Sequence, residues 1–268
     1  MFLRVHHPLT AKIIILFVLL LLPAITGAST KVEPSKFIFT LKPGERITDA
    51  VKVTNIQNRE ANFTANIYDW TLDEQERLVT FTAGSLPDTL EGLIKFNPRR
   101  FTLKPGESQY VRFTLSAPKS GDWSEKKGII FFEQELAPSD QGIESAIVTQ
   151  VGATVYLSFT DTLRAFHFYG AQVATPKGEA PTVLLDLANE GQGHIRYQIF
   201  YQLMTPDGAL LEENHLGEQL ILPEVRRQFS FPLSGVLGPG HYHLSLKISF
   251  WGTTQQYQTS VAFTIEEP

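Results

Sequence analysis

Short runs of Val, Ile, Thr, Phe and Tyr, separated by clusters of Gly, Pro, Asn and Asp, fill the chain from Ser29 onward. The breaks recur about every 8 to 12 residues, a spacing typical of β-sandwiches. No segment shows a convincing helical period, so the sequence predicts an all-β fold class. Strands are expected at 36–41, 48–55, 61–70, 109–116, 128–135 and 146–159, and then at 166–173, 182–187, 196–204, 209–212, 227–231, 241–250 and 256–265.

The segment Phe-Thr-Leu-Lys-Pro-Gly-Glu occurs twice without change, at 39–45 and 101–107. Proline at the second position of a turn fixes φ, and glycine at the third position accepts the positive φ that a type II turn requires. Pro43 with Gly44, and Pro105 with Gly106, are therefore predicted to be structural turn residues. A functional Lys-Pro-Gly-Glu loop is the alternative.

The start of the chain has the order of an export signal. A short basic stretch that contains Arg4 and Lys12 precedes an apolar run from Ile13 to Leu22, and small residues follow up to Ala28. A membrane-spanning helix needs about 20 apolar residues, and this run is shorter. We expect residues 1–28 to be a signal peptide cleaved after Ala28, with an uncleaved anchor as the alternative. No later segment is apolar enough to span a membrane.

Charge and cysteine content exclude several classes of function. The chain has 23 Lys and Arg against 28 Asp and Glu, and loss of residues 1–28 changes the formal charge from −5 to −7. An acidic chain without a basic run is a poor nucleic-acid binder, so no nucleic-acid partner is expected. The absence of cysteine excludes disulfides, thiol nucleophiles and Cys-ligated metal centres. The remaining length accommodates two domains, predicted as 29–162 and 163–268 because 160–165 reads as a short connection.

Four stretches carry a resemblance to a known family. They are Phe37-Ile38-Phe39, Val51-Lys52-Val53-Thr54-Asn55, the run from Asn97-Pro98-Arg99-Arg100-Phe101 through Pro105-Gly106-Glu107 to Val111-Arg112-Phe113, and Lys127-Gly128-Ile129-Ile130-Phe131-Phe132-Glu133. The segment from residue 34 to about 158 resembles the amino-terminal domain of PapD-like periplasmic pilus (fimbrial) chaperones. This resemblance implies two immunoglobulin-like sandwiches and a periplasmic location.

The resemblance also implies partners and binding residues. Such chaperones bind exported pilus or surface subunits by β-strand addition, and an outer-membrane usher is a further partner. Client-binding residues are expected at Lys36, Ile143, Ile147 and Val151. Arg112 stands where the family has a paired structural Arg near the domain junction, with a solvated strand residue as the alternative. Lys36 replaces the usual Arg of the carboxylate anchor, and Val151 stands where a Lys is expected. Half of that anchor is therefore missing.

No catalytic residues, metal site or cofactor are predicted, and we do not expect an enzyme. His241 and His243 share one face of a strand, but two ligands do not complete a metal site. Asp69 and the acidic run from Asp73 to Glu76 read as a solvated turn. Ser124 and Lys127 have Ser-x-x-Lys spacing, but in a segment read as a loop where a buried, activating Lys is not expected.

Two functions follow from these patterns. One is a periplasmic chaperone-like protein that binds exported subunits by strand addition. The alternative is a non-catalytic structural or surface-associated adaptor on the same scaffold, which the missing anchor residue and the weak apolar alternation near Ile143 favour.

Overall fold

The computed structural model describes residues 29–136, 147–251 and 255–267, and strands are the only regular elements in these ranges. This confirms the all-β fold class. The expected signal peptide, residues 1–28, lies outside the described residues. The first strands are β1 (Thr30–Glu33), β2 (Lys36–Leu41), β3 (Arg46–Asn55), β4 (Ala61–Leu72), β5 (Leu78–Thr82), β6 (Ile94–Asn97), β7 (Arg100–Leu103), β8 (Ser108–Ser116), β9 (Lys126–Leu136) and β10 (Ile147–Phe159).

These ten strands form one sandwich, the first domain. One sheet has the order β1-β3-β8-β6, and the other has the order β2-β10-β9-β4-β5, with β7 also paired to β4. Apolar residues at every second position of the strands fill the space between the sheets, as the period of a half-buried strand requires. Val111, Phe113 and Leu115 of β8 are all buried in this core, where the Phe113 ring meets the edge of Phe37 at 4.9 Å.

Both copies of the repeated segment form tight turns of the same geometry. The amide of Glu45 donates to the Lys42 carbonyl, the amide of Glu107 donates to the Lys104 carbonyl, and both central glycines have a φ of +77°. Each Glu side chain also accepts a hydrogen bond from the backbone amide of the Lys three residues earlier. These are the features of a type II turn with an added side-chain bridge, which explains why glutamate ends both copies.

The two turns are anchored at opposite ends of one strand pair. Gly44 donates to the carbonyl of Pro118, just beyond the end of β8, whereas Gly106 donates to the carbonyl of Asn55, the last residue of β3. Because β3 and β8 are antiparallel, the turn that precedes β3 lies beside the end of β8. The turn that precedes β8 lies in the same way beside the end of β3.

The second domain is a smaller sandwich of seven strands: β11 (Phe166–Ala174), β12 (Thr182–Asn189), β13 (Ile195–Met204), β14 (Leu210–Ile221), β15 (Val225–Pro232), β16 (Gly240–Phe250) and β17 (Gln256–Ile265). Its sheets have the orders β11-β12-β15 and β14-β13-β16-β17. Tyr197 and Tyr201 of β13 are buried between the sheets with Ile199. The turn at Thr205–Gly208 joins β13 to β14 as a hairpin, and Gly208 has a φ of +86°.

Sequence patterns located the long strands and missed short ones. β1, β5, β6 and β7 have only four or five residues each, too few to show an alternation. The expected strand at 209–212 is the beginning of β14, which continues to Ile221. Exposed polar residues such as Glu213 and Asn214 fill this part of β14, so its sequence lacks the apolar period on which the prediction depended.

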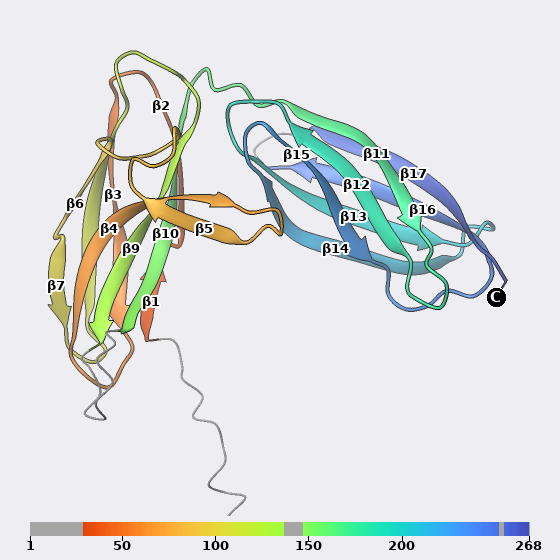
Figure 1. Ribbon diagram of the computed structural model, residues 1–268, viewed down its shortest axis with the longest axis horizontal. Helices are drawn as coiled ribbons and strands as arrows, with labels where there is room; N and C mark the ends of the chain where they lie inside the picture. The colour runs from red at the N-terminus through yellow and green to blue at the C-terminus, as the bar shows by residue number, and fades with distance from the viewer. Residues whose placement is uncertain (1–28, 137–146, 252–254, 268) are drawn as a thin grey trace, which may run out of the picture.

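Figure 1 shows the two domains set at an angle, with the β4–β5 hairpin reaching from the first domain to β14 of the second. A separate apolar cluster lies at this junction. Trp70, Ile129 and Tyr156 of the first domain pack there with Leu222 of the second, and all four are buried. The domains therefore share an apolar contact as well as a connecting segment, and this contact fixes the walls of the cleft described next.

Candidate functional site

The edge of β10 provides a backbone surface to which another strand can pair. From Ile147 to Leu157 β10 pairs with β9 on one side, but its parallel partner on the other side, β2, begins only at the pair Lys36 and Thr154. Among the described residues, no strand pairs with 147–153 on that side. The backbone amide and carbonyl groups of 147–153 that point away from β9 therefore have no strand partner, and such an edge is a template for strand addition.

Lys36 stands at the end of this open edge. Since β2 runs parallel to β10 and begins at Lys36, a strand added alongside 147–153 in the same direction would end against the Lys36 side chain. The carboxyl terminus of an added parallel strand would therefore meet an ammonium group. A strand added in the opposite direction would bring an amino terminus there, and the two like charges would repel.

The second domain holds a carboxylate and a second cation against Lys36. Oε1 of Glu218, on β14, accepts hydrogen bonds from Nζ of Lys36 and from Nε of Arg196, on β13, each at 2.8 Å. Arg196 also bonds the other oxygen of Glu218 through its terminal nitrogen, so its planar group grips the carboxylate with two donors. Burial of the ammonium and the positive charge of Arg196 lower the pKa of Lys36 from 10.5.

A pocket of about 590 Å³ opens beside Arg196, between the domains. Its lining combines cations with apolar and aromatic groups: Ile38, Arg164, Phe166, His194, Ile195, Arg196, Phe250, Trp251 and Gln255. Trp251 is 58% exposed and its ring lies 5.2 Å from the Arg196 guanidinium, while Ile38 is 41% exposed on β2. The cleft therefore offers apolar contacts next to positive charge, a combination that suits an apolar peptide ending in a carboxylate.

Beneath the cleft lies a buried polar cluster that joins the domains. Oε1 of Glu125 lies 2.6 Å from Nδ1 of His194 and also accepts the backbone amide of His194, and Oε2 accepts the hydroxyl of Ser158 at 2.6 Å. Arg164 donates to that same hydroxyl at 2.9 Å. The side chain of Glu125 is 1% exposed and that of His194 is 4% exposed. A buried carboxylate needs these hydrogen bonds in place of water, so Glu125 holds Ser158 and His194 in fixed positions.

The environment of this cluster shifts two pKa values. Burial alone would raise the pKa of Glu125, but the hydrogen bonds and positive charge of His194, together with the Ser158 hydroxyl, hold that pKa below 4.5. Tyr156, whose ring lies 4.2 Å from the His194 ring, has a pKa raised to about 12, first by burial and then by the Glu125 charge. Glu125 is therefore ionised and Tyr156 neutral near pH 7.

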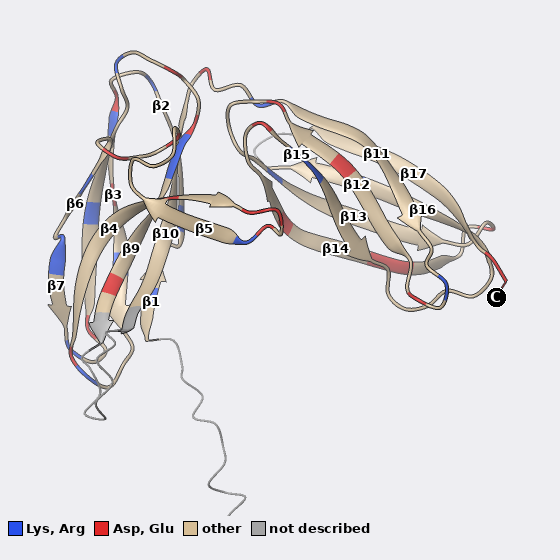
Figure 2. Cartoon of the chain, viewed as in Figure 1, with Lys and Arg blue, Asp and Glu red and all other residues tan. Residues whose placement is uncertain are grey.

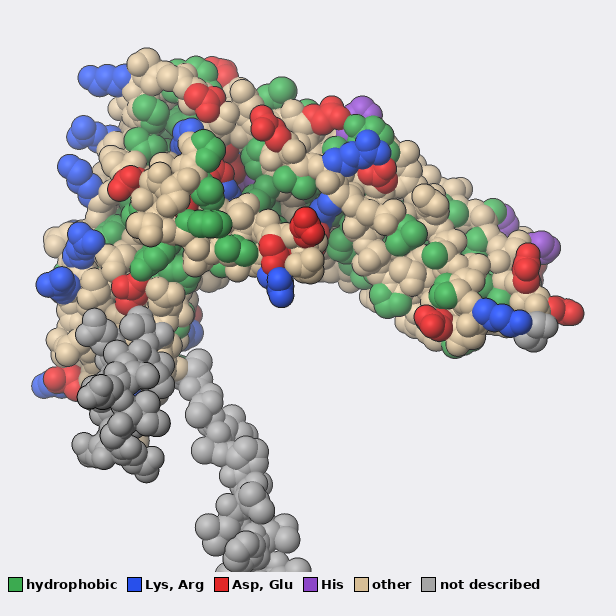
Figure 3. Space-filling view, viewed as in Figure 1, with side chains coloured by type: hydrophobic (Ala, Val, Ile, Leu, Met, Phe, Trp, Pro, Cys, Tyr) green, Lys and Arg blue, Asp and Glu red, His purple; other side chains and the backbone are tan. Residues whose placement is uncertain are grey.

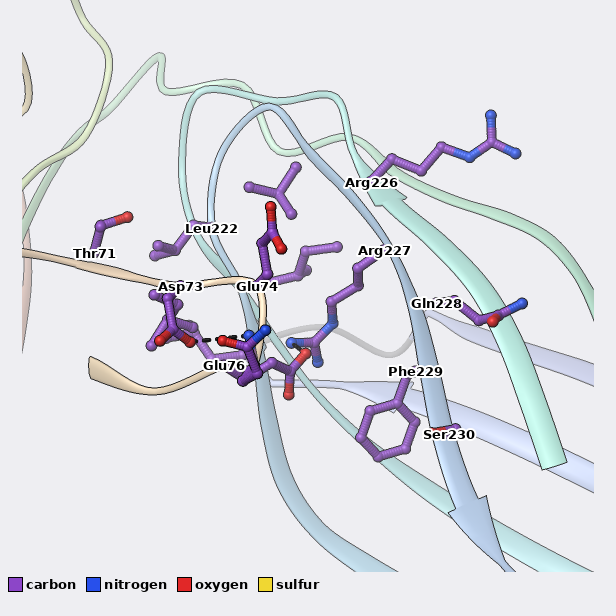
Figure 4. A pocket seen from close by; sticks show the side chains of 15 residues that line it. Thr71, Asp73, Glu74, Glu76, Leu222, Arg226, Arg227, Gln228, Phe229 and Ser230 are labelled. Atoms are coloured by element: carbon purple, nitrogen blue, oxygen red, sulfur yellow. Dashed lines mark hydrogen bonds and ion pairs between the residues drawn. The ribbon is translucent and has the colours of Figure 1, made fainter. Parts of the chain in front are cut away.

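A second contact between the domains comes from the tip of the β4–β5 hairpin. Glu76 of that tip forms an ion pair with Arg227 on β15, and Arg227 also donates to the Tyr197 hydroxyl at 2.7 Å. Figure 4 shows Glu76 and Arg227 turned toward each other in the pocket between the hairpin and β15, while Arg226 points away. The hairpin tip thus braces the second domain at a point separate from Glu125.

Three of the four client-binding residues predicted from the sequence lie in the part of the chain that the structure describes. Lys36 lies at the end of the open edge, and Ile147 is the first residue of β10. Val151 is half-buried within the unpaired stretch of β10, in the same alternation as the buried Ala153. Ile143 lies outside the described residues.

The expected ion pair of Arg112 is absent among the described residues. Arg112 is exposed on β8, opposite Ala50 of β3 and Asn97 of β6, and no ion pair joins it to the residues that the structure describes. The two turns of the repeated segment contain the predicted structural residues Pro43, Gly44, Pro105 and Gly106.

Two interpretations of acidic and basic residues were wrong. Asp69 does not lie in a solvated turn: it is fully buried on β4, where its oxygens accept the Leu86 amide and the Thr89 hydroxyl. Lys127 is on β9 rather than in a loop, and its side chain is 4% exposed and paired with Asp88. The Asp69 carboxylate and the Lys127 ammonium each have local partners because burial leaves polar groups no water to bond.

His241 is exposed on β16 and its Nδ1 lies 2.9 Å from the Thr264 hydroxyl, and His243 is exposed on the same strand. Within 29–136, 147–251 and 255–267 no group of three or more His, Asp or Glu residues is placed to hold a metal ion. In those same ranges no helix is long and apolar enough to cross a bilayer.

Sequence reasoning missed the second-domain half of the cleft. Arg196, Glu218 and His194 lie more than a hundred residues from Lys36 in the sequence. One signal was present: Arg196 is a charged residue at the start of a strand with apolar residues at alternate positions. Such a charge in a strand that leads into a core needs a partner, but the sequence does not show which one.

The chain is a two-domain, all-β protein with two immunoglobulin-like sandwiches and an open strand edge beside the cleft between them. Its structure is similar to those of PapD-like fimbrial chaperones. The class 5 fimbriae chaperone CfaA matches with 14% identity and a TM-score of 0.45, over 89% of this chain and 99% of the other. The CsuC–CsuE chaperone–tip adhesion subunit complex of Acinetobacter baumannii matches with 13% identity and a TM-score of 0.44, over 87% and 98%.

A third similar structure is the Salmonella enterica SafA pilin in complex with the SafB chaperone, with 10% identity and a TM-score of 0.43 over 87% of this chain and 96% of the other. No family model matches the sequence. No curated protein sequence matches it either. At these identities the likeness concerns the fold alone.

Proposed function

We propose that this protein is an exported, chaperone-like protein that binds incompletely folded β subunits by strand addition to β10. The observation that carries the proposal is the coincidence of two features: the stretch 147–153 is unpaired on one side, and Lys36 closes that stretch. A subunit that lacks one strand exposes unpaired amides and an apolar core. The open edge of β10 supplies the missing backbone partner, and export places the protein in the periplasm.

The cleft gives the added strand a direction and an end point. Lys36 and Arg196 lie on either side of the Glu218 carboxylate, so the cleft already accommodates a carboxylate between two cations. In the proposal, the terminal carboxylate of a client strand takes the place of Glu218 on Lys36. Arg196 then provides the second cation, from the second domain, that Val151 does not provide in the first.

This arrangement makes Glu218 a competitor of the client. An ion pair whose side chains are about one-third exposed contributes little to stability, so its replacement by a client carboxylate has a small cost. Neutralising Glu218 would leave Lys36 and Arg196 as neighbouring cations without a shared anion. We therefore expect Glu218→Gln to bind clients more tightly and Lys36→Glu to bind them more weakly.

The experiment is capture of clients from the periplasmic extract of the protein's own host. Tagged protein carries a photo-crosslinking amino acid at Gln150, which is exposed on the open edge, and the products are identified by mass spectrometry. Lys36→Glu and Glu218→Gln are tested in parallel, with Lys177→Glu in the second domain as a charge-matched control. A crosslinking position at Leu210, which is 54% exposed on β14, controls for nonspecific capture.

The proposal would be supported if small exported β proteins are crosslinked at Gln150. The yield of crosslinked product should decrease in Lys36→Glu and increase in Glu218→Gln. Crosslinks that are equal at Gln150 and Leu210, or that Lys36→Glu leaves unchanged, would contradict it. Stable recovery of envelope components under those conditions would support the adaptor function instead.

A further inference from the structure

The face of the β1-β3-β8-β6 sheet that points away from the core is basic. On each strand, the residues that alternate with the buried ones form this face. Its basic residues are Lys31, Arg46, Lys52, Lys95 and Arg112. Figures 2 and 3 show Lys and Arg along the outer margin of the first domain, around β6 and β7. We call this set of five residues the basic face.

Strand register places the cations of the basic face next to one another. Ala50 is opposite Arg112 and Lys52 is opposite Tyr110, so Lys52 and Arg112 are diagonal neighbours on β3 and β8. Lys95 of β6 is opposite Thr114 and is therefore diagonal to Arg112 on its other side. Diagonal positions in antiparallel strands lie about 7–8 Å apart, close enough for like charges to reinforce one potential.

Few carboxylates offset this charge. Glu33 is the acidic residue that alternates onto the basic face, and it pairs with Lys31 at 2.8 Å. Asp49 of β3 lies two residues from the buried Val51, so it has the same phase as Val51 and belongs to the other side of the strand. Within the part of the chain that the structure describes, no ion pair or hydrogen bond engages the side chains of the remaining four cations, which are Arg46, Lys52, Lys95 and Arg112. They are free to bind an external anion.

The basic face contrasts with the rest of the molecule. The whole chain has a formal charge of −5, and residues 163–268 contain 6 Lys and Arg against 10 Asp and Glu. A local positive face on an acidic protein orients the protein toward a polyanion and turns its other surfaces away. The remaining surface of this face is polar, with Thr48 bonded to Thr114 and Thr54 bonded to Ser108, apart from Tyr110, which is 60% exposed.

We propose that the basic face docks on an anionic phospholipid surface. A sheet face with cations on neighbouring strands matches a planar array of negative headgroups, and each Lys or Arg near such a surface contributes about 1 kcal/mol. Tyr110 lies among these cations, and aromatic rings with a polar end favour the membrane–water interface.

The test is partition of the chain that begins at Ser29 into lipid vesicles. Vesicles of equal parts phosphatidylglycerol and phosphatidylcholine are compared with vesicles of phosphatidylcholine alone, at low and high ionic strength. The patch variant carries Lys52→Gln, Lys95→Gln and Arg112→Gln. A control variant with the same net charge carries Lys177→Gln, Arg226→Gln and Lys247→Gln in the second domain. Thermal melting confirms that each variant is folded.

We expect partition into the anionic vesicles only, weakening with salt, and reduced about a hundredfold by the patch variant but little by the control variant. Absence of partition by the folded chain at low ionic strength would overturn the proposal. Equal losses in the two variants would also overturn it, because net charge alone would then explain binding. Retention by heparin without partition into vesicles would overturn the proposal, because the basic face would then bind an anionic polysaccharide and not a lipid surface. Lys36 is unchanged in all variants, so the outcome is separate from that for client binding.

Discussion

Nδ1 of His194 lies 2.6 Å from Oε1 of Glu125, and the two residues belong to different domains. Glu125 immediately precedes β9 of the first domain, and His194 immediately precedes β13 of the second. Because both side chains are almost fully buried, each needs the other to replace lost water. This buried polar pair and the apolar cluster around Leu222 therefore both hold the two domains together at the cleft.

Removal of the Glu125 carboxylate should loosen the domain junction. Glu125→Ala leaves the His194 ring and the Ser158 hydroxyl without their buried acceptor, and breaking a buried pair of this kind costs about 3–5 kcal/mol. Urea unfolding followed by tryptophan fluorescence measures the change in free energy. Glu60→Ala, at an exposed loop position, is the control and should change stability by about 0.5 kcal/mol or less. Equal effects of the two substitutions would contradict the structural role of Glu125.

Acidification should weaken the same junction. The pKa of Glu125 lies below 4.5 in the folded protein, so the unfolded chain binds this proton more readily than the folded one. The contribution of Glu125 to stability is therefore complete above about pH 4.5 and is lost as the pH falls through the lower, folded-state pKa. The free energy of unfolding should decrease as the pH is lowered through this range. The dependence of that free energy on pH should be weaker in Glu125→Gln. An identical slope in both proteins would assign the acid sensitivity to other carboxylates.

The apolar contact between the domains can be tested at Leu222, which is 7% exposed and packs with Trp70. Leu222→Ala should cost about 2–5 kcal/mol, because truncation of a buried leucine loses apolar contact and leaves a cavity. The fluorescence of Trp70, which is 2% exposed, should shift to longer wavelength in the variant. Leu210→Ala, at a 54% exposed position of β14, should leave both the stability and the spectrum unchanged.

The repeated turns make a prediction about glycine. Gly106 has a φ of +77°, and a Cβ added there would meet no atom within 4 Å, so Gly106→Ala introduces conformational strain without a steric clash. The left-handed conformation costs an L-residue about 1–2 kcal/mol, and thermal unfolding should show this loss. Gly217→Ala, where φ is not positive and the space is also open, isolates the effect of φ. A loss at Gly217 as large as that at Gly106 would show that φ is not the cause.

The long strands and the paired turns could be predicted because their signals are local. Alternation at Val111, Phe113 and Leu115 reflects burial on one face, and Pro-Gly dictates its turn without help from distant residues. The cleft could not be predicted in the same way. Arg196 and Glu218 reach Lys36 only through the packing of one domain on the other, which no local pattern records.

The burial of charge was likewise hidden from the sequence. Asp69 and Lys127 are charged residues of β4 and β9, and their partners, Thr89 and Asp88, come from the segment between β5 and β6. A prediction from composition assigns such residues to solvent because most charged residues lie there. The exceptions depend on long-range pairing.

The positions of the two identical turns determine how β3 and β8 can align. One turn is tied to the residues after β8, and the other is tied to Asn55 at the end of β3, so the strand pair is pinned at both ends. Slippage by one residue would move every core side chain of a strand to the opposite face and would also have to detach both turns together. The repeated segment thus acts as an alignment device. It selects one pairing of the central strands during folding and excludes its nearest competitors.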